Sequence, residues 1–279
     1  MSPPRTSTSP RSAGVQEPAL GREVALVARP HGHLQLGSSP RTGTVVGPFG
    51  AEDLSALLKL HRDAAGTTDA VRSRGERVLV ELLAAGVPPH LLRTSAVDRS
   101  GTRIVAVIGK GACADVLRTT LAACDLAVDT SGTRRPELVV LVDEHAARAG
   151  VADGLIAENI PHLSVVLRDT DALVGPLVYP GLTPCLRCLD LYRTDDDPGW
   201  PLVLDQFTRL LPSIRADAPT ATTVAGLVAL QVLTHLDGGQ PTSLGATMEL
   251  LVPEGTVQVR RWNVHPQCGC VELPLPEPG

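Results

Sequence analysis

The chain has 279 residues and a formal net charge of −5, with 43% hydrophobic residues but only 2% aromatic ones. This length and apolar content are enough for one or two domains whose cores are built from valine, leucine and alanine. Residues 1–98 are near neutral, with 11 basic and 9 acidic side chains, and residues 99–279 are acidic, with 14 against 21. Neither part is the polycation that nucleic-acid binding favours, so we expect no nucleic-acid partner.

The first segment, residues 1–21, is rich in Ser, Pro, Thr and Gly. It lacks the apolar stretch of a secretory signal, and we predict a disordered tail. No run of the chain approaches the roughly eighteen apolar residues of a membrane-spanning helix. We therefore expect a cytoplasmic protein without a membrane partner, in a compartment that keeps thiols reduced.

A small module of strands followed by helices is predicted for residues 22–98. Short apolar segments between Pro- and Gly-containing turns predict strands at residues 23–27, 33–36 and 43–46. Apolar residues at helical spacing predict a helix from Ala51 and another across residues 71–83, which ends before Gly86-Val87-Pro88. Three strands followed by helices is the outline of a winged-helix-like domain.

This module has two possible uses. Domains of this outline often bind DNA, but the near-neutral charge does not favour that use. An exposed edge strand beside a helix can instead accept an extended peptide as an added strand, with the peptide side chains in the adjoining groove. For a peptide we predict an edge and a groove formed by Thr44, Val45, Val46, Val78, Leu79 and Leu82.

The second region, residues 99–279, follows a polar joint at residues 95–101 and begins like a dinucleotide-binding fold. Residues 103–108 are a continuous apolar run, typical of a strand buried in a parallel sheet. This run leads into the pattern Gly-x-Gly-x-x-Ala at residues 109–114, the phosphate-binding turn of such folds. A second short strand ends in an acid, where a ribose ligand belongs. The sequence therefore predicts a nucleotide turn with Gly109, Gly111 and Asp129.

The connection that follows is too short for this pattern to continue. Six residues, 130–135, separate the second strand from the apolar strand at 136–143, fewer than a crossover helix needs. Periodicity then predicts a helix at 146–158, strands at 160–166 and 173–179, a helix at 221–236, and a hairpin of residues 246–252 and 256–262. We expect an α/β domain from which part of the nucleotide-binding unit is missing, which argues against ATP as a cofactor.

The strongest chemical signal is two close pairs of cysteines. Cys185 and Cys188 form one pair and Cys268 and Cys270 the other. Two such pairs from distant segments provide the four thiolates of a tetrahedral zinc site, which leaves no open position for substrate and is therefore structural. Two disulfides, a redox-active Cys-x-x-Cys pair and unconnected thiols are the alternatives, and a reducing compartment disfavours the disulfides.

Three other features have ordinary structural explanations. The acidic run at residues 195–197 is expected to be a solvated helix end or loop rather than a metal site. His265 is expected to order the turn that carries the second cysteine pair. Cys113 and Cys124 are expected to be small buried apolar residues rather than nucleophiles.

Taken together, these motifs resemble a known family. The resemblance rests on the glycine turn and on the segments Gly175-Pro176-Leu177-Val178, Pro184-Cys185-Leu186-Arg187-Cys188-Leu189 and His265-Pro266-Gln267-Cys268-Gly269-Cys270. The chain resembles the ThiF-like adenylate-forming activating enzymes. More narrowly, residues 22–276 are similar to actinobacterial proteins described as TOMM precursor leader peptide-binding or bacteriocin biosynthesis cyclodehydratase-domain proteins.

The resemblance implies a winged-helix-like RiPP recognition element followed by a degenerate ThiF-like Rossmann domain with structural zinc. It implies that the first part captures the leader of a precursor peptide. The second part would present the peptide to a separate YcaO-type cyclodehydratase in the biosynthesis of thiazole- and oxazole-modified peptides. The resemblance also allows a homodimer.

Enzymatic activity is the point on which the chain departs from the activating enzymes. Their ATP-binding Asp-x-Asp segment and the Asn, Arg, Gln and Lys positions after it fall in the stretch missing between Asp129 and Pro136, and Lys110 is the one lysine left nearby. We therefore expect a non-catalytic scaffold. An active adenylyltransferase that acts on the C-terminus of a carrier peptide is the alternative, and a zinc-containing transcription factor is a third hypothesis.

Overall fold

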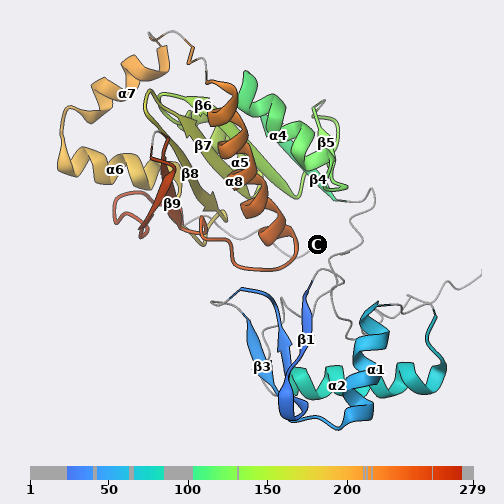
Figure 1. The fold of residues 1–279 in the computed structure, drawn as a ribbon. Helices are drawn as coiled ribbons and strands as arrows, with labels where there is room; N and C mark the ends of the chain where they lie inside the picture. Colours follow the sequence, from blue (N-terminus) through green and yellow to red (C-terminus); the bar gives the residue numbers. More distant parts are fainter. Residues whose placement is uncertain are drawn as a thin grey trace, which may run out of the picture. The chain divides into compact units, whose positions relative to one another are not determined.

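The computed structural model describes residues 24–39, 43–62, 66–84, 103–130, 132–209, 211, 213–214, 216–252 and 254–271. The chain divides into two compact units, residues 1–97 and 98–279 (Figure 1). The sequence analysis sets this boundary one residue later. The predicted tail at 1–21, the joint at 95–101 and the helix end at Gly86-Val87-Pro88 lie outside the described residues.

In its described residues the first unit is a three-stranded antiparallel sheet with two helices. Its elements are β1 (Leu26–Ala28), the 3₁₀ turn η1 (Pro30–Gly32), β2 (Leu34–Leu36), β3 (Thr44–Val46), α1 (Ala51–Arg62) and α2 (Asp69–Ala84). The strand order is β1-β2-β3, so β1 and β3 are the two edges. The first strand begins three residues later than predicted, because its pairing with β2 runs from Leu26 opposite Leu36 to Ala28 opposite Leu34.

A small apolar core joins this sheet to the helices. Alternation along β2 directs Leu34 and Leu36 to the helices, where both are fully buried. The helix residues of this core are Leu57 from α1 and Val78, Leu79 and Leu82 from α2. The same alternation leaves the other face of the sheet with exposed side chains, Val27 on β1 and Val45 on β3.

The second unit is built on a seven-stranded mixed sheet. Its elements are β4 (Ile104–Ile108), α4 (Ala112–Ala122), β5 (Ala127–Asp129), β6 (Leu138–Glu144), α5 (Ala149–Ala157), β7 (His162–Leu167), β8 (Asp171–Val178), α6 (Leu186–Asp196), α7 (Trp200–Arg209), α8 (Ala218–Leu236), β9 (Ala246–Leu251) and β10 (Thr256–Arg261). The strand order is β10-β9-β8-β7-β6-β4-β5. Pairing is parallel from β5 to β7 and antiparallel from β7 to β10.

The two faces of this sheet carry different layers. Helices α4 and α8 pack against each other on one face (Figure 1), over a core that includes Leu117, Leu163 and Val228. The opposite face meets α5 and α6 through a second apolar cluster that includes Leu141 and Leu186. Strand β7 is buried along its whole length, which explains why its sequence is apolar on both faces.

The short connection predicted after β5 is confirmed. Among the described residues between β5 and β6 the structure has no helix, and Asp129 accepts a hydrogen bond from the backbone amide of Arg134 at 3.2 Å. The Asp129 carboxylate therefore holds the short turn that replaces a crossover helix.

Helix α8 is longer than predicted, with 19 residues from Ala218 to Leu236. By length and composition alone it could cross a membrane, and the sequence analysis did not note this candidate. In the structure the helix begins with Pro219 in its first turn and a cap from Asp217, whose side chain accepts the amide of Thr220 at 2.9 Å. Its buried residues, such as Val228 and Val232, belong to the core over the sheet.

One buried titratable group makes stability depend on pH. Burial lowers the pKa of His162 on β7, and its Nε2 has no hydrogen-bond partner among the described residues. The unfolded chain then takes up a proton that the folded chain excludes. The contribution of His162 to the free energy of unfolding is therefore fully present above about pH 7 and falls as the pH drops below about 6.5. The slope is at most about 1.4 kcal/mol per pH unit for one group.

We expect His162→Gln to reduce this acid destabilisation, because the variant cannot take up the proton. Urea unfolding between pH 5.5 and 7.5 measures it, with the solvent-accessible His33→Gln as the control that keeps the slope. Burial also lowers the pKa of His61 and His235, so the variant removes only part of the effect. An unchanged slope in His162→Gln would show that His162 is not the cause.

Candidate functional site

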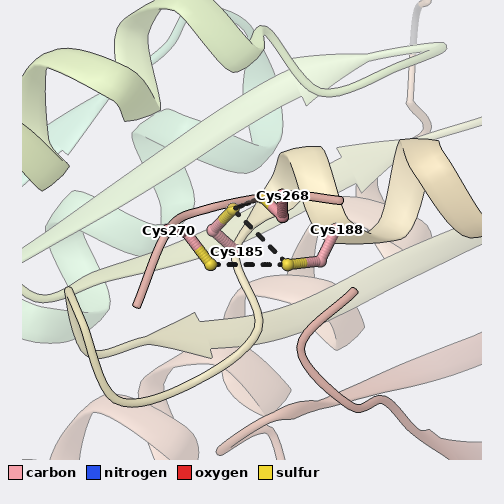
Figure 2. Close-up of side chains that lie close together, drawn as sticks. All are labelled: Cys185, Cys188, Cys268 and Cys270. Atoms are coloured by element: carbon pink, nitrogen blue, oxygen red, sulfur yellow. Dashed lines mark hydrogen bonds between the residues drawn. The ribbon is translucent and has the colours of Figure 1, made fainter. Parts of the chain in front are cut away.

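The four cysteines of the two predicted pairs converge at one place in the second unit. Cys185 is the N-cap residue of α6 and Cys188 lies in its first turn, while Cys268 and Cys270 lie in the turn that follows β10. All four side chains are buried, and their sulfur atoms lie within 4.8 Å of one another. Figure 2 shows the four side chains directed toward a common point.

The distances between the sulfur atoms decide between the alternatives for this cluster. Cys185 Sγ lies 3.8 Å from Cys188 Sγ and 3.5 Å from Cys268 Sγ, and Cys188 Sγ lies 3.5 Å from Cys270 Sγ. A tetrahedral site with metal–sulfur bonds of about 2.3 Å places its sulfurs about 3.8 Å apart. A disulfide bond of about 2.05 Å does not fit these separations. The cluster could therefore hold a metal such as zinc.

Electrostatics explain why thiolates in this cluster would need a cation. Burial raises the pKa of Cys185 and raises the pKa of Cys270 to about 12, whereas at Cys188 burial is outweighed by hydrogen bonds, which lower the pKa. Buried thiolates in such a cluster repel one another, so they need a cation at their centre to be stable together. The N-terminus of α6, which carries Cys185 and Cys188, contributes a partial positive charge on the same side.

His265 orders the second cysteine pair, in agreement with the sequence analysis. Its imidazole is buried, and Nδ1 accepts the backbone amide of Gln267 at 3.2 Å. The ring proton is then on Nε2, which donates to Asp195 at the end of α6 at 2.9 Å. The carbonyl of His265 accepts the amide of Cys268 at 3.0 Å. This histidine therefore connects α6 to the turn that carries Cys268 and Cys270, while the four cysteines are the candidate metal ligands.

The glycine turn after β4 has a structural reason of its own. Gly109 has φ of +152°, and a Cβ on it would lie 2.4 Å from the backbone oxygen of Val142 on β6. Arg118 of α4 donates from Nη2 to the carbonyl of Gly109 at 2.7 Å and to that of Val107 at 3.1 Å. The close approach of the turn to Val142 therefore requires glycine at position 109, whether or not a phosphate binds there.

A cavity of about 440 Å³ lies beside this turn, lined among others by Gly109, Lys110, Asp143 and Glu144. It lies where β4 has β5 on one side and β6 on the other, which is the place at which open α/β sheets bind ligands. Asp143 is buried and pairs with Arg148 at 2.5 Å. The sequence analysis did not single out Asp143 and Glu144, the two acids at the end of β6. A buried strand that ends in two acids is a signal that could have revealed them.

The three predicted nucleotide residues are not brought together around this cavity. Gly109 lines it, but Gly111 and Asp129 are not among the residues that do. Gly111, with φ of +91°, is the N-cap residue of α4, and the Asp129 carboxylate holds the turn after β5. The glycine turn has the predicted backbone shape, whereas Asp129, which was predicted to bind a ribose, does not line the cavity.

The predicted peptide-binding residues fall into two groups. Thr44, Val45 and Val46 form β3, an edge of the first sheet, and Val45 is 46% exposed. Val78, Leu79 and Leu82 are at most 2% exposed and lie in the core of the unit. The expectation that these three line a groove is wrong, because they pack against Leu34 and Leu36 of β2.

Comparison with known proteins places the fold. No family model matches the chain, and no curated protein matches it in sequence. Among solved structures, MccB of E. coli bound to MccA is 14% identical with a TM-score of 0.55, over 92% of this chain and 100% of that one. The heterocyclase TruD is 16% identical with a TM-score of 0.57, over 91% of this chain and 42% of TruD.

A heterocyclase solved with substrate and cofactor has a TM-score of 0.62 at 14% identity and is covered over 39% of its length. At these identities the likeness shows the fold, which includes both units of the chain. The chain spans about two fifths of the length of the two heterocyclases.

We expect purified protein to contain one zinc ion per chain, measured by elemental analysis of protein prepared without chelator. A structural zinc site contributes on the order of 10 kcal/mol of apparent binding free energy. Cys185→Ser should therefore lose the metal and unfold the second unit. The control is Cys124→Ser, a half-buried cysteine outside the cluster that should keep both metal and fold. Metal-free protein that is fully folded would contradict the assignment.

We expect ATP with Mg²⁺ to bind weakly or not at all. The cavity beside the glycine turn is lined by two acids. Of the cations among its described lining residues, Arg148 is paired with Asp143, which leaves Lys110 to meet the phosphates. Titration calorimetry measures this, with MccB, whose structure is known with ATP, as the positive control. A dissociation constant in the low micromolar range would contradict the prediction.

Proposed function

We propose that this chain is a non-catalytic cytoplasmic scaffold that binds the leader of a precursor peptide and presents the peptide to a separate YcaO-type cyclodehydratase. The observation that carries the proposal is the likeness to MccB solved with MccA and to a heterocyclase solved with substrate. This likeness extends over more than 90% of the chain and so includes the small first unit as well as the sheet domain. In this proposal the first unit is a winged-helix-like peptide-binding module and the second a ThiF-like Rossmann domain with structural zinc.

The edge strand β3 supports a peptide site in the first unit. It is a terminal strand of the sheet, and Val45 on it is one of the exposed large apolar residues. A peptide added beside β3 would gain main-chain hydrogen bonds, which provide affinity with little dependence on sequence. Its alternate side chains would lie on the open face beside Val45 and on the face of Thr44 and Val46, which pair with Leu36 and Leu34.

A scaffold role agrees with the surroundings of the glycine turn. The carbonyl of Gly109 is occupied by Arg118, and the acids of the adjacent cavity are engaged within the protein. Transfer of an adenylyl group requires preorganised cations or a metal at the phosphates. Among the described lining residues, Lys110 and Arg148 are the cations of this cavity, and Arg148 is paired.

The proposal assigns the cyclisation to a partner enzyme. The two heterocyclases are more than twice as long as the part that this chain matches. The same scaffold would also be compatible with a homodimer, which sedimentation of the purified chain can test.

A pair of matched proline variants tests the peptide site. Val45 on β3 and Ala28 on β1 are both exposed and lie on opposite edges of the sheet. The backbone bonds that flank β1 and the strand registers direct the amides of both residues away from β2, so proline removes an outward donor in each case. We expect Val45→Pro to weaken binding of the leader peptide about tenfold, the equivalent of about 1.4 kcal/mol, because an added strand loses a backbone donor and meets the ring. Ala28→Pro should leave the affinity within about twofold.

The measurement is fluorescence anisotropy of the full-length protein with a labelled leader from a precursor peptide encoded beside this gene. Thermal unfolding of both variants controls for damage to the fold. Equal affinity of the wild type and Val45→Pro would contradict peptide addition at β3, and a preference for duplex DNA would favour the transcription-factor hypothesis.

The alternative is an active adenylyltransferase. It is favoured by the cavity at the glycine turn and by the likeness to MccB, which has been solved with ATP. ATP–pyrophosphate exchange that depends on a carrier peptide would establish it. No exchange, together with peptide binding in the anisotropy experiment, would support the scaffold.

A further inference from the structure

A second cavity, of about 370 Å³, lies on the face of the large sheet opposite α4 and α8. Ser164 and Val166 of β7 and Leu173 of β8 form its sheet side. Helix α6 contributes Leu189, and α7 contributes Trp200 and Phe207. Most of the lining is therefore aliphatic or aromatic, and its size falls within the range of small-molecule sites, about 300–1,000 Å³.

Ser164 distinguishes this cavity from a packing void. Ser164 is 1% exposed, and its Oγ has no hydrogen-bond partner among the described residues. The neighbours Leu163 and Val165 point to the opposite face and join the core under α4 and α8. A buried hydroxyl without a partner is costly in an otherwise apolar wall, so a ligand that bonds to it would recover that cost.

The charged groups around the cavity compensate one another. Asp190 accepts from Arg193 Nη1 at 3.0 Å and from Trp200 Nε1 at 3.1 Å, both on Oδ1. Arg168 forms ion pairs with Asp171 and Glu249. Because each arginine already has its carboxylate, the wall does not favour an ionic ligand. It favours a neutral one.

We propose that this cavity binds a neutral aromatic ring with one hydrogen-bonding substituent, the chemistry of a phenol. The ring would pack against Trp200 and Phe207, and its hydroxyl would bond to Ser164 Oγ. The site is in the second unit and is independent of the proposed peptide site at β3, so either can fail without the other. The same ring could belong to a free small molecule or to a tyrosine side chain of a peptide.

The test is titration calorimetry of the full chain with p-cresol and with toluene, which differ in the hydroxyl alone. We expect p-cresol to bind roughly fivefold more tightly than toluene, the equivalent of about 1 kcal/mol for one hydrogen bond. Ser164→Ala should remove this difference and leave toluene binding unchanged. Since Ser164 Oγ has no partner to lose, the variant should fold with unchanged thermal stability.

Ser243→Ala is the matched control. Ser243 is also fully buried, and within the described part of the chain its Oγ has no hydrogen-bond partner. It does not line this cavity, so its variant should keep the preference for p-cresol. N-acetyltyrosine amide separates the two sources: binding that depends on Ser164 would show that the ring can be carried by a peptide, and binding of p-cresol alone would indicate a free small molecule. Failure of both p-cresol and toluene to bind, or the same preference in Ser164→Ala, would overturn the proposal.

Discussion

The convergence of four buried thiols is the interaction on which the second unit depends most. Cys185 and Cys188 begin α6, and Cys268 and Cys270 follow the last strand, so the cluster joins two segments that are 83 positions apart at Cys185 and Cys268. Helix α6 in turn forms a wall of the cavity over Ser164. Without a cation the buried thiolates would repel one another. With one, the cluster holds α6 and the C-terminal turn in a fixed geometry.

The glycine turn shows how a sequence pattern can have a structural reason that does not depend on a ligand. Gly109 is required by the close approach of Val142, and Arg118 occupies the carbonyls of the turn. In a nucleotide-binding protein the same glycines allow a phosphate to approach the backbone. Here a short link joins β5 to β6, and the Asp129 carboxylate accepts a hydrogen bond within that link.

Local patterns predicted much of this fold because they depend on short-range physics. Continuous apolar runs identified β4 and β6, and helical spacing identified α1 and α8. The cysteine pairs predicted the cluster, since close spacing within each pair is itself the signal. Which face of α2 meets the sheet was not predicted correctly, because periodicity shows that one face is apolar without showing what covers it. Thus Val78, assigned to a groove, lies in the core.

The cavity over Ser164 could not have been predicted, since its walls come from two strands and from two later helices whose places over the sheet are set by tertiary packing. A serine within an apolar strand is unremarkable in sequence. Its meaning depends on whether another side chain reaches the hydroxyl, and that is a property of the assembled layers. The two acids at the end of β6 are visible in the sequence, but their partners, which come from the segments that follow, are not.

The separation of the cysteine pairs also has a consequence for the order of folding. A metal ion can be held by all four thiolates only after β8, α8 and the β9–β10 hairpin have been made, because the second pair lies beyond them in the chain. On the ribosome the first unit is complete long before that point. Metal supply would therefore control how much of the second unit reaches its final form, while the module that carries β3 would be ready in either case.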